Sequence, residues 1–276
     1  MARYKLTLEY DGTSYSGWQT QKNARSIQGT LISAAQQLLG REIDIQGAGR
    51  TDAGVHALAQ VAHLETGLAL PPKKLLEGLN DRLPSNINVL RVEKVHAQFH
   101  ARHHAVARTY VYLVSRYRTA FGKRYVWWVR DPLAVEKMQA ACALFHGFHD
   151  FFSFADKRFD KDASTLVKVD RIEIISQEGL IVFRITGSHF LWKMVRRMVG
   201  VLVEVGRGKL APGDIEGILT AFSETPAKCT APPSGLFLMQ VQYAGDPEET
   251  VRLPFLITPF MKVKKPAEGP AKPIPA

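Results

Sequence analysis

Hydrophobic residues along the chain follow two periods, that of a strand and that of an amphipathic helix. Residues 4–10 alternate Tyr and Leu with Lys, Thr and Glu, which predicts a strand with one buried face. Ser26 can cap a helix whose apolar side chains recur at helical spacing until Gly40, a residue type common at helix ends. The same patterns predict the other elements of the first half, which are strands around 43–45, 57–64 and 89–95 and a helix over 71–83.

The second half repeats this order of elements and adds one helix. Its longest helical pattern covers 191–205, with a buried stripe made of Leu191, Met194, Val195, Met198, Leu202 and Val205. The other predicted elements are strands at 108–114, 167–175, 180–185 and 236–243 and helices at 135–145 and 215–222. We therefore expect an α+β fold of two similar α/β halves. Their mainly antiparallel sheets would join across a central cleft, with the helices packed behind.

The repeated order also predicts where the chain divides. We place the boundary near Ala105, between an N-terminal half over 1–104 and a C-terminal half over 105–246. Residues 247–276 form a C-terminal extension that is basic and rich in Pro. Because this extension lacks hydrophobic periodicity beyond about Lys262, we expect it to be flexible.

Composition narrows the class of protein. A hydrophobic fraction of 46% and a charged fraction of 22% are ordinary for a globular protein. The two cysteines, Cys142 and Cys229, form no CxxC pair, which argues against a zinc site or a disulfide framework. No apolar run approaches the roughly 20 residues that span a bilayer, and the N-terminus resembles a strand more than a signal peptide. We expect a cytoplasmic protein with no membrane partner.

The charge balance adds a candidate partner. The chain has 36 Lys and Arg against 26 Asp and Glu, a formal net charge of +10. Such an excess favours binding to a polyanion such as nucleic acid, although a basic protein without such a partner has the same composition.

The most unusual stretch is the loop GAGRTDAGVH at 47–56, in which three glycines surround Arg50 and Asp52. It is not a dinucleotide fingerprint, because Asp52 occupies the last glycine position and a strand follows where a helix is required. It also lacks the GK[ST] ending of a phosphate-binding loop. The alternative is a tight connection in which Asp52 accepts hydrogen bonds from local amides.

This loop, with the following ALAQVAHLET, resembles the signature of the tRNA pseudouridine synthase A family. Six further segments resemble the family in the same order, namely YDGTSYSGWQTQ, SIQGTL, LNDRLPSNINV, FHARHHAVARTYVY, GSHFLWKMVRRMVGVLVEVGRG and APPSGLFLMQVQY. Agreement is weaker at about 156–171. Trp192 and Lys193 also differ from the Tyr or His types expected at their positions.

The resemblance implies both a fold and an activity. The fold would be that of the pseudouridine synthases, with the central cleft binding RNA. The enzyme would isomerise uridine to pseudouridine at positions 38 to 40 of tRNA, on the 3′ side of the anticodon stem-loop, and would work as a homodimer. Two alternatives stay open at this point, which are the same chemistry on another RNA and a non-catalytic RNA-binding protein.

The resemblance also implies four site residues. Asp52 matches the catalytic aspartate, which acts as nucleophile or base, and Arg196 matches its ion-pair partner. Tyr110 matches the aromatic residue that stacks on the target uracil, and Arg50 matches the residue that holds the target base out of its stack. Without the resemblance, Tyr110 would be an ordinary core tyrosine and Arg196 a solvated helix residue. We choose Arg196 over Arg197 because MVR aligns with the family motif.

These residue types suit the chemistry. The reaction breaks the bond from C1′ to N1 of uridine and joins C1′ to C5, so it is neither a redox step nor a group transfer, and we expect no cofactor. A carboxylate near C1′ can act as nucleophile or base, and a guanidinium keeps it charged. An aromatic face retains the detached uracil, once the target nucleotide has left its stack.

Four histidines cluster in sequence at 96, 100, 103 and 104. A metal site there would need further ligands, and no cysteine or paired carboxylate lies nearby to complete one. We expect no metal site and assign the histidines a structural or RNA-facing role.

Overall fold

The structure, a computed structural model, describes residues 1–40, 43–156, 164–177 and 179–246. In these ranges the N-terminal half supplies strands β1 (Ala2–Tyr10), β2 (Asp44–Gly47), β3 (His56–Thr66) and β4 (Ile87–Val95). The C-terminal half supplies β5 (Ala105–Ser115), β6 (Trp127–Trp128), β7 (Gly147–Asp150), β8 (Leu166–Gln177), β9 (Leu180–Gly187) and β10 (Leu236–Tyr243).

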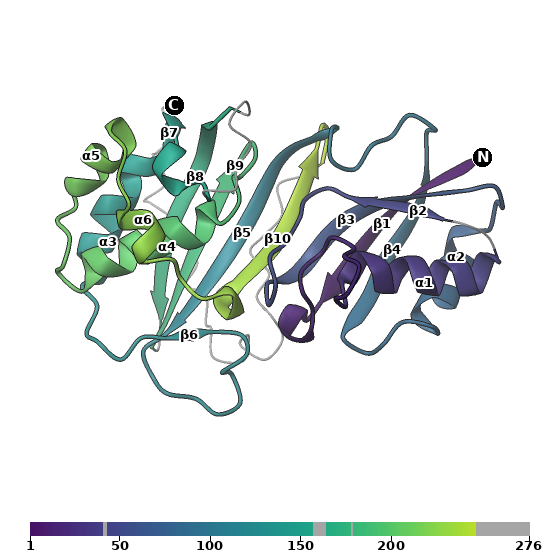
Figure 1. Ribbon diagram of the computed structural model, residues 1–276, viewed down its shortest axis with the longest axis horizontal. Coiled ribbons are helices and arrows are strands. Elements are labelled where there is room, and N and C mark those ends of the chain that lie inside the picture. The colour runs from purple at the N-terminus through teal and green to yellow at the C-terminus, as the bar shows by residue number, and fades with distance from the viewer. Residues whose placement is uncertain (41–42, 157–163, 178, 247–276) are drawn as a thin grey trace, which may run out of the picture.

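These strands form one continuous sheet in the order β4-β1-β3-β10-β5-β9-β8-β7, with β2 beside β3 and β6 beside β5 (Figure 1). The last strand, β10, lies between the two halves, where it pairs with β3 in parallel and with β5 in antiparallel orientation. Most other pairs are antiparallel, so the predicted α+β fold with a mainly antiparallel sheet is confirmed. Strand β10 therefore joins the halves into one sheet.

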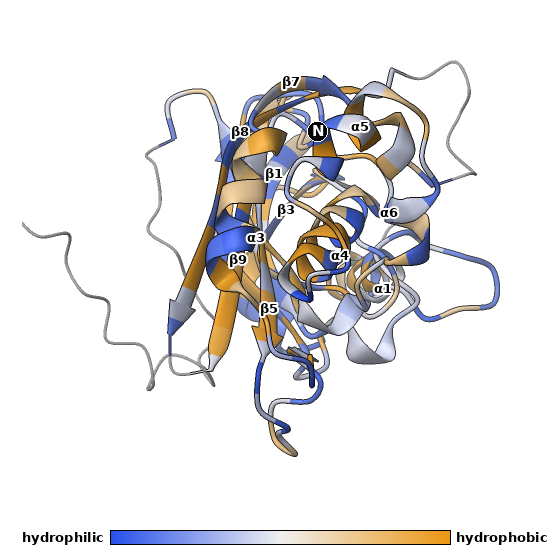
Figure 2. Cartoon of the chain, turned by 90° about the vertical axis from the view of Figure 1, so that its left-hand side faces the viewer, coloured by the Kyte–Doolittle hydropathy of each residue, from blue (hydrophilic) through white to orange (hydrophobic). Residues whose placement is uncertain are grey.

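The helices follow the predicted order along the chain. They are α1 (Ile27–Leu39), α2 (Pro72–Asn80), α3 (Val135–Cys142), α4 (Met194–Gly206), α5 (Asp214–Thr220) and α6 (Thr225–Lys228). The Ser26 side chain accepts a hydrogen bond from the Gly29 amide, and Gly40 ends α1 in the left-handed conformation, as the sequence predicts. In Figure 2, α1, α4 and α6 lie on the same side of strands β5, β8 and β9. No helix in the described ranges is long and apolar enough to cross a membrane.

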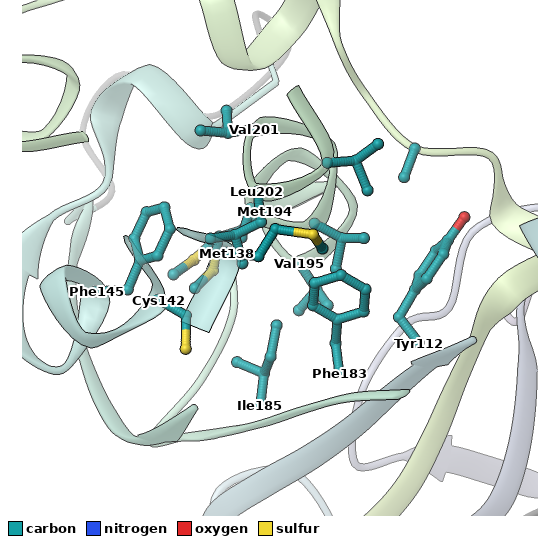
Figure 3. Close-up of a cluster of buried hydrophobic side chains, with 14 of the residues drawn as sticks. Tyr112, Met138, Cys142, Phe145, Phe183, Ile185, Met194, Val195, Val201 and Leu202 are labelled. Carbon is teal, nitrogen blue, oxygen red and sulfur yellow. The ribbon is translucent and has the colours of Figure 1, made fainter. Parts of the chain in front are cut away.

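Each half has its own hydrophobic core beneath its helices. In the C-terminal half, α4 packs onto β5 and β9, where Val195 lies close to Tyr112 and Phe183 (Figure 3). All six residues of the predicted stripe are buried, five of them on this helix and Leu191 just before it. This burial fixes α4 against the sheet and so fixes where the polar residues at the start of the helix point.

Several elements differ from the sequence prediction. The helix expected over 191–205 begins at Met194, because Lys193 takes a left-handed conformation with φ of 64° that interrupts regular helix geometry. The helix expected at 135–145 continues after Cys142 as a 3₁₀ turn over Ala143–Phe145. Strands β6 and β7 and helix α6 were not predicted, since two to four residues are too few for a clear period.

The predicted division of the chain stays a prediction. Ala105 is the first residue of β5, while β10, from the C-terminal half, pairs with strands of both halves. The predicted C-terminal extension, 247–276, lies outside the described residues.

Candidate active site

The glycine-rich loop lies between β2 and β3, next to the junction of the two halves. Leu238 on β10 is the register partner of Ala57 at the start of β3 and also of Tyr110 on β5. The loop that carries Asp52 therefore ends two strands away from Tyr110. The sheet topology brings together two residues that are 58 positions apart in the sequence.

A second segment, YDGTSYSGW at 10–18, packs against this loop and forms hydrogen bonds with it. The backbone amide of Trp18 donates to the Thr51 carbonyl at 3.0 Å, and the Tyr10 hydroxyl lies 2.8 Å from the Thr51 hydroxyl. Gly17 has a φ of 97°, and a Cβ atom there would stand 2.6 Å from the Thr51 carbonyl oxygen. Only glycine allows this approach, so the segment holds the backbone next to Asp52 in one conformation.

Asp52 forms an ion pair with Arg196 in the first turn of α4. Arg196 Nη1 lies 2.9 Å from Asp52 Oδ2, and the two side chains are 13% and 18% exposed. The Nε of the same guanidinium donates to the Ala231 carbonyl at 2.7 Å, while the Ala231 amide donates to the Arg196 carbonyl at 3.0 Å. Two hydrogen bonds with Ala231 thus hold Arg196 in place, and one N–H group of its guanidinium donates to the Asp52 carboxylate.

The chain at 229–231 can pass close to α4 beside Arg196 only because residue 200, one turn further along the helix, is glycine. A Cβ atom at Gly200 would stand 1.7 Å from the Cys229 carbonyl oxygen, so only glycine lets the chain at 229–231 lie against the helix. That contact brings the Ala231 carbonyl within reach of Arg196.

The other oxygen of Asp52 has a donor of its own. The indole N–H of Trp192 donates to Asp52 Oδ1 at 2.7 Å, and the residue is 38% exposed. Sequence reasoning missed this residue. The available signal was that Trp192 stands where the resemblance leads one to expect a different residue type.

Tyr110 lies half-buried beside this pair. Its ring meets Phe190 edge to face, with centroids 5.3 Å apart, and it packs against the cores of both halves. Burial raises the pKa of Tyr110 to about 12; the charge of Arg108 lowers it and the nearby Asp52 carboxylate raises it. The hydroxyl is therefore protonated at neutral pH, and the residue offers a neutral aromatic surface next to Asp52.

Arg50 and Arg197 are placed differently from Arg196. Arg50 is exposed on the loop, two residues before Asp52. Arg197 is buried and points away from Asp52, since it donates to the Ala155 carbonyl and lies 3.9 Å from Asp156 Oδ2. Of the two neighbouring arginines, Arg196 is the one that contacts Asp52.

Arg108 is a second residue whose position the sequence did not reveal. Its guanidinium donates to four carbonyl oxygens, those of Ala48, Arg102, Ala105 and Ser188, at 2.8 to 3.2 Å. Ala48 belongs to the glycine-rich loop and Ser188 to the chain that leads to α4. Arg108 therefore ties together two segments that carry the site.

The clustered histidines lie at the far end of β3. The His100 ring is tilted against that of His103, with ring centroids 4.1 Å apart, and against that of buried His63, at 4.7 Å. Burial lowers the pKa of His63 to about 4, so its ring is neutral at physiological pH, and its Nδ1 accepts a hydrogen bond from the Ala101 amide. His63 and its hydrogen bond thus have a structural role.

The family profile described as tRNA pseudouridine synthase matches residues 7–104 and 141–244. The chain belongs to this family. Asp52, Arg50 and Arg196 lie inside the matched ranges, and Tyr110 lies between them.

Curated relatives agree with this membership. The chain is 39% identical over 246 residues to tRNA pseudouridine synthase A of Ruminiclostridium cellulolyticum, covering 88% of this chain and all of that protein. It is equally similar, with the same coverage, to tRNA pseudouridine synthase A 2 of Bacillus cereus. A likeness to the solved archaeal box H/ACA sRNP Nop10–Cbf5 complex covers 72% of this chain and 43% of that one, at 12% identity and a TM-score of 0.36. Family membership makes the protein an isomerase that converts uridine to pseudouridine in tRNA.

Proposed function

We propose that this synthase modifies uridines at positions 38 to 40 in the anticodon stem-loop of tRNA, with Asp52 at the reaction centre. The observation that carries the assignment of the centre is the contact of Asp52 with Arg196 beside Tyr110. A carboxylate, a guanidinium and an aromatic ring thus come from three separate elements to one place. The choice of tRNA positions rests on the sequence resemblance to the synthase A family.

In the proposed reaction, Asp52 acts on the ribose of a uridine that has left its stack. The carboxylate attacks C1′ or removes a proton from the sugar, and the bond from C1′ to N1 breaks. The uracil turns and C1′ joins C5. On the first route C5 displaces the carboxylate, so the ester bond between Asp52 and C1′ breaks, and on the second route the proton returns to the sugar. On both routes C5 then loses a proton and N1 gains one. No atom is lost from the nucleotide except through this exchange of protons, and no electrons enter or leave.

Arg196 would keep Asp52 charged throughout these steps. A carboxylate in a partly enclosed site loses solvation, which favours its neutral form, whereas a guanidinium at 2.9 Å favours the charged form. Because Arg196 is itself anchored on the Ala231 carbonyl, this support does not depend on the substrate.

Tyr110 and Arg50 would contact the RNA. Tyr110 offers a neutral ring on which the detached uracil can stack. Arg50, exposed on the same loop as Asp52, can occupy the space that the extruded nucleotide leaves in the RNA stack. We also propose that the enzyme is cytoplasmic, as its composition suggests, and that it is a homodimer, as the resemblance implies.

The proposed positions can be tested with tRNA transcripts that carry tritium at C5 of uridine, because joining C1′ to C5 expels that hydrogen. We expect release from transcripts with uridine at 38, 39 or 40 and none when all three are cytidine. Equal release from both sets would place the reaction elsewhere on the RNA. Tight binding without release from any transcript would favour a non-catalytic RNA-binding protein.

Tyr110→Ala should reduce the rate of a single turnover by roughly 10- to 100-fold, because it removes a stacking contact worth about 1–3 kcal/mol. Tyr110→Phe keeps the ring and should stay within about fivefold of the unmodified enzyme. Rapid-quench measurement of tritium release compares the two variants. If Tyr110→Phe is as slow as Tyr110→Ala, the hydroxyl and not the aromatic face is the functional part.

A further inference from the structure

The Asp52 carboxylate is held at both oxygens, and by two different residues. Arg196 Nη1 donates to Oδ2 at 2.9 Å, and Trp192 Nε1 donates to Oδ1 at 2.7 Å. A guanidinium commonly binds a carboxylate through two parallel hydrogen bonds, which fix the plane of the carboxylate. Here the Arg196 Nε is already used on the Ala231 carbonyl, so the arginine gives Asp52 a single hydrogen bond in this structure.

One hydrogen bond leaves the carboxylate free to rotate about the Cβ–Cγ bond. The donor on Oδ1 removes this freedom, because the two contacts approach different oxygens. A carboxylate has about four lone-pair sites, so the two donors leave others open toward the substrate. The orientation of those open sites toward a ribose would therefore depend on Trp192 as well as on Arg196.

The backbone and the side chains around Trp192 hold its indole in the orientation that points toward Asp52. The next residue, Lys193, has a φ of 64°, a costly conformation for a residue with a side chain. Leu191 and Met194 on either side are buried, and Lys193 Nζ lies 2.7 Å from Asp156 Oδ2. The same ammonium lies 5.4 Å from the centroid of the Trp192 ring. The turn is thus anchored on both sides of the indole.

We infer that Trp192 is a positioning residue for catalysis, which fixes the Asp52 carboxylate through its indole N–H while the target uridine is bound. The inference rests on the proposed role of Asp52. It assigns to Trp192 the second hydrogen bond that Arg196 does not supply. Trp192 would act on the rate of the chemical step and much less on the affinity for RNA.

Two substitutions at Trp192 distinguish the role of the indole N–H from that of the aromatic ring. Trp192→Phe keeps an aromatic ring but has no donor, whereas Trp192→His can place a ring N–H three bonds from Cβ, as tryptophan does. We expect Trp192→Phe to slow a single turnover about 10- to 100-fold, the usual effect of losing a hydrogen bond to a charged group. We expect Trp192→His to recover most of that loss and tRNA affinity to stay within about threefold for both. Trp128→Phe makes the same change at another exposed tryptophan, 42% exposed on β6, and should leave the rate unchanged.

A structural readout does not depend on activity. The chain has four tryptophans, so the nitrogen–proton spectrum contains four indole signals, and Trp192→Phe identifies one of them. That signal should shift when Asp52→Ala removes the acceptor and should keep its position when the unmodified enzyme binds tRNA.

The outcomes distinguish this inference from the proposed function. An active Asp52→Asn variant would refute the assignment of Asp52 and the inference with it. An inactive Asp52→Asn variant together with a fully active Trp192→Phe variant would refute only the role of Trp192. An indole signal that is insensitive to Asp52→Ala, or that moves to a free position when tRNA binds, would also overturn that role.

Discussion

Asp52→Asn is expected to lower the rate of pseudouridine formation by about 1000-fold or more, with tRNA affinity changed by less than about threefold. The amide keeps the size of the carboxylate but has neither its charge nor its basicity, so it can neither attack C1′ nor accept a proton from the sugar. Single-turnover tritium release measures the rate, and filter binding at fixed salt measures the affinity. Release within tenfold of the unmodified enzyme would refute the assignment.

The two donors on Asp52 sharpen this expectation. The carboxylate presents an acceptor to Arg196 and another to Trp192, whereas an asparagine has one acceptor and one donor. Whichever way the amide is turned, a donor faces a donor. Asp44→Asn is the matched control, because Asp44 is an exposed carboxylate at the start of β2 and should tolerate the same change without loss of activity.

Local patterns in the sequence were sufficient for much of the fold. The limits of α1 followed from Ser26 and Gly40, and β10 was predicted to the residue as 236–243. Helix α1 has a clear period and a signal at each end, and β10 is a short apolar run after the turn signal PPSG, so nearby residues were enough to predict both. The buried stripe of α4 was correct for the same reason, since helix periodicity specifies which face packs against the sheet.

Those local patterns could not predict the contacts between distant segments of the chain. Trp192 and Asp52 are 140 residues apart. The periodicity of a segment cannot predict that the indole before α4 contacts the loop before β3. The parallel pairing of β10 with β3, which brings the halves together, is a long-range choice of the same kind. The resemblance supplied Arg196 as the partner of Asp52, but it did not supply Trp192, where this chain departs from the expected residue type.

The start of α4 shows why such departures matter. Helical periodicity extended the predicted helix back to residue 191, whereas the structure begins it at Met194 after the left-handed Lys193. The side chains at 192 and 193 therefore do not follow the helical rotation. Their directions, toward Asp52 and Asp156, come from the turn and not from the helix.

Arg196→Ala is expected to slow a single turnover by roughly 100-fold or more, because it leaves the Asp52 carboxylate without its charged partner in a partly enclosed site. Breaking such a pair costs about 3–5 kcal/mol when both groups are buried, and the 13% and 18% exposure of these side chains brings the effect toward the lower end. Arg196→Lys should be intermediate, since an ammonium keeps the charge but is a poorer match for the two acceptors, Asp52 and the Ala231 carbonyl.

Arg197→Ala is the matched control, because it removes the neighbouring arginine of the same helix turn without touching Asp52. Arg197 is buried, donates to the Ala155 carbonyl and faces Asp156, which keeps Lys193 as a partner at 2.7 Å. Its loss should therefore lower Tm by roughly 3–10 °C and leave the single-turnover rate at 20 °C within about threefold. Thermal melts and tritium release on the same preparations separate the two effects. Equal losses of rate in Arg196→Ala and Arg197→Ala, at equal folded fraction, would show that the Asp52–Arg196 pair has no special part in the reaction. A larger loss of rate in Arg197→Ala would mean that the catalytic arginine is Arg197.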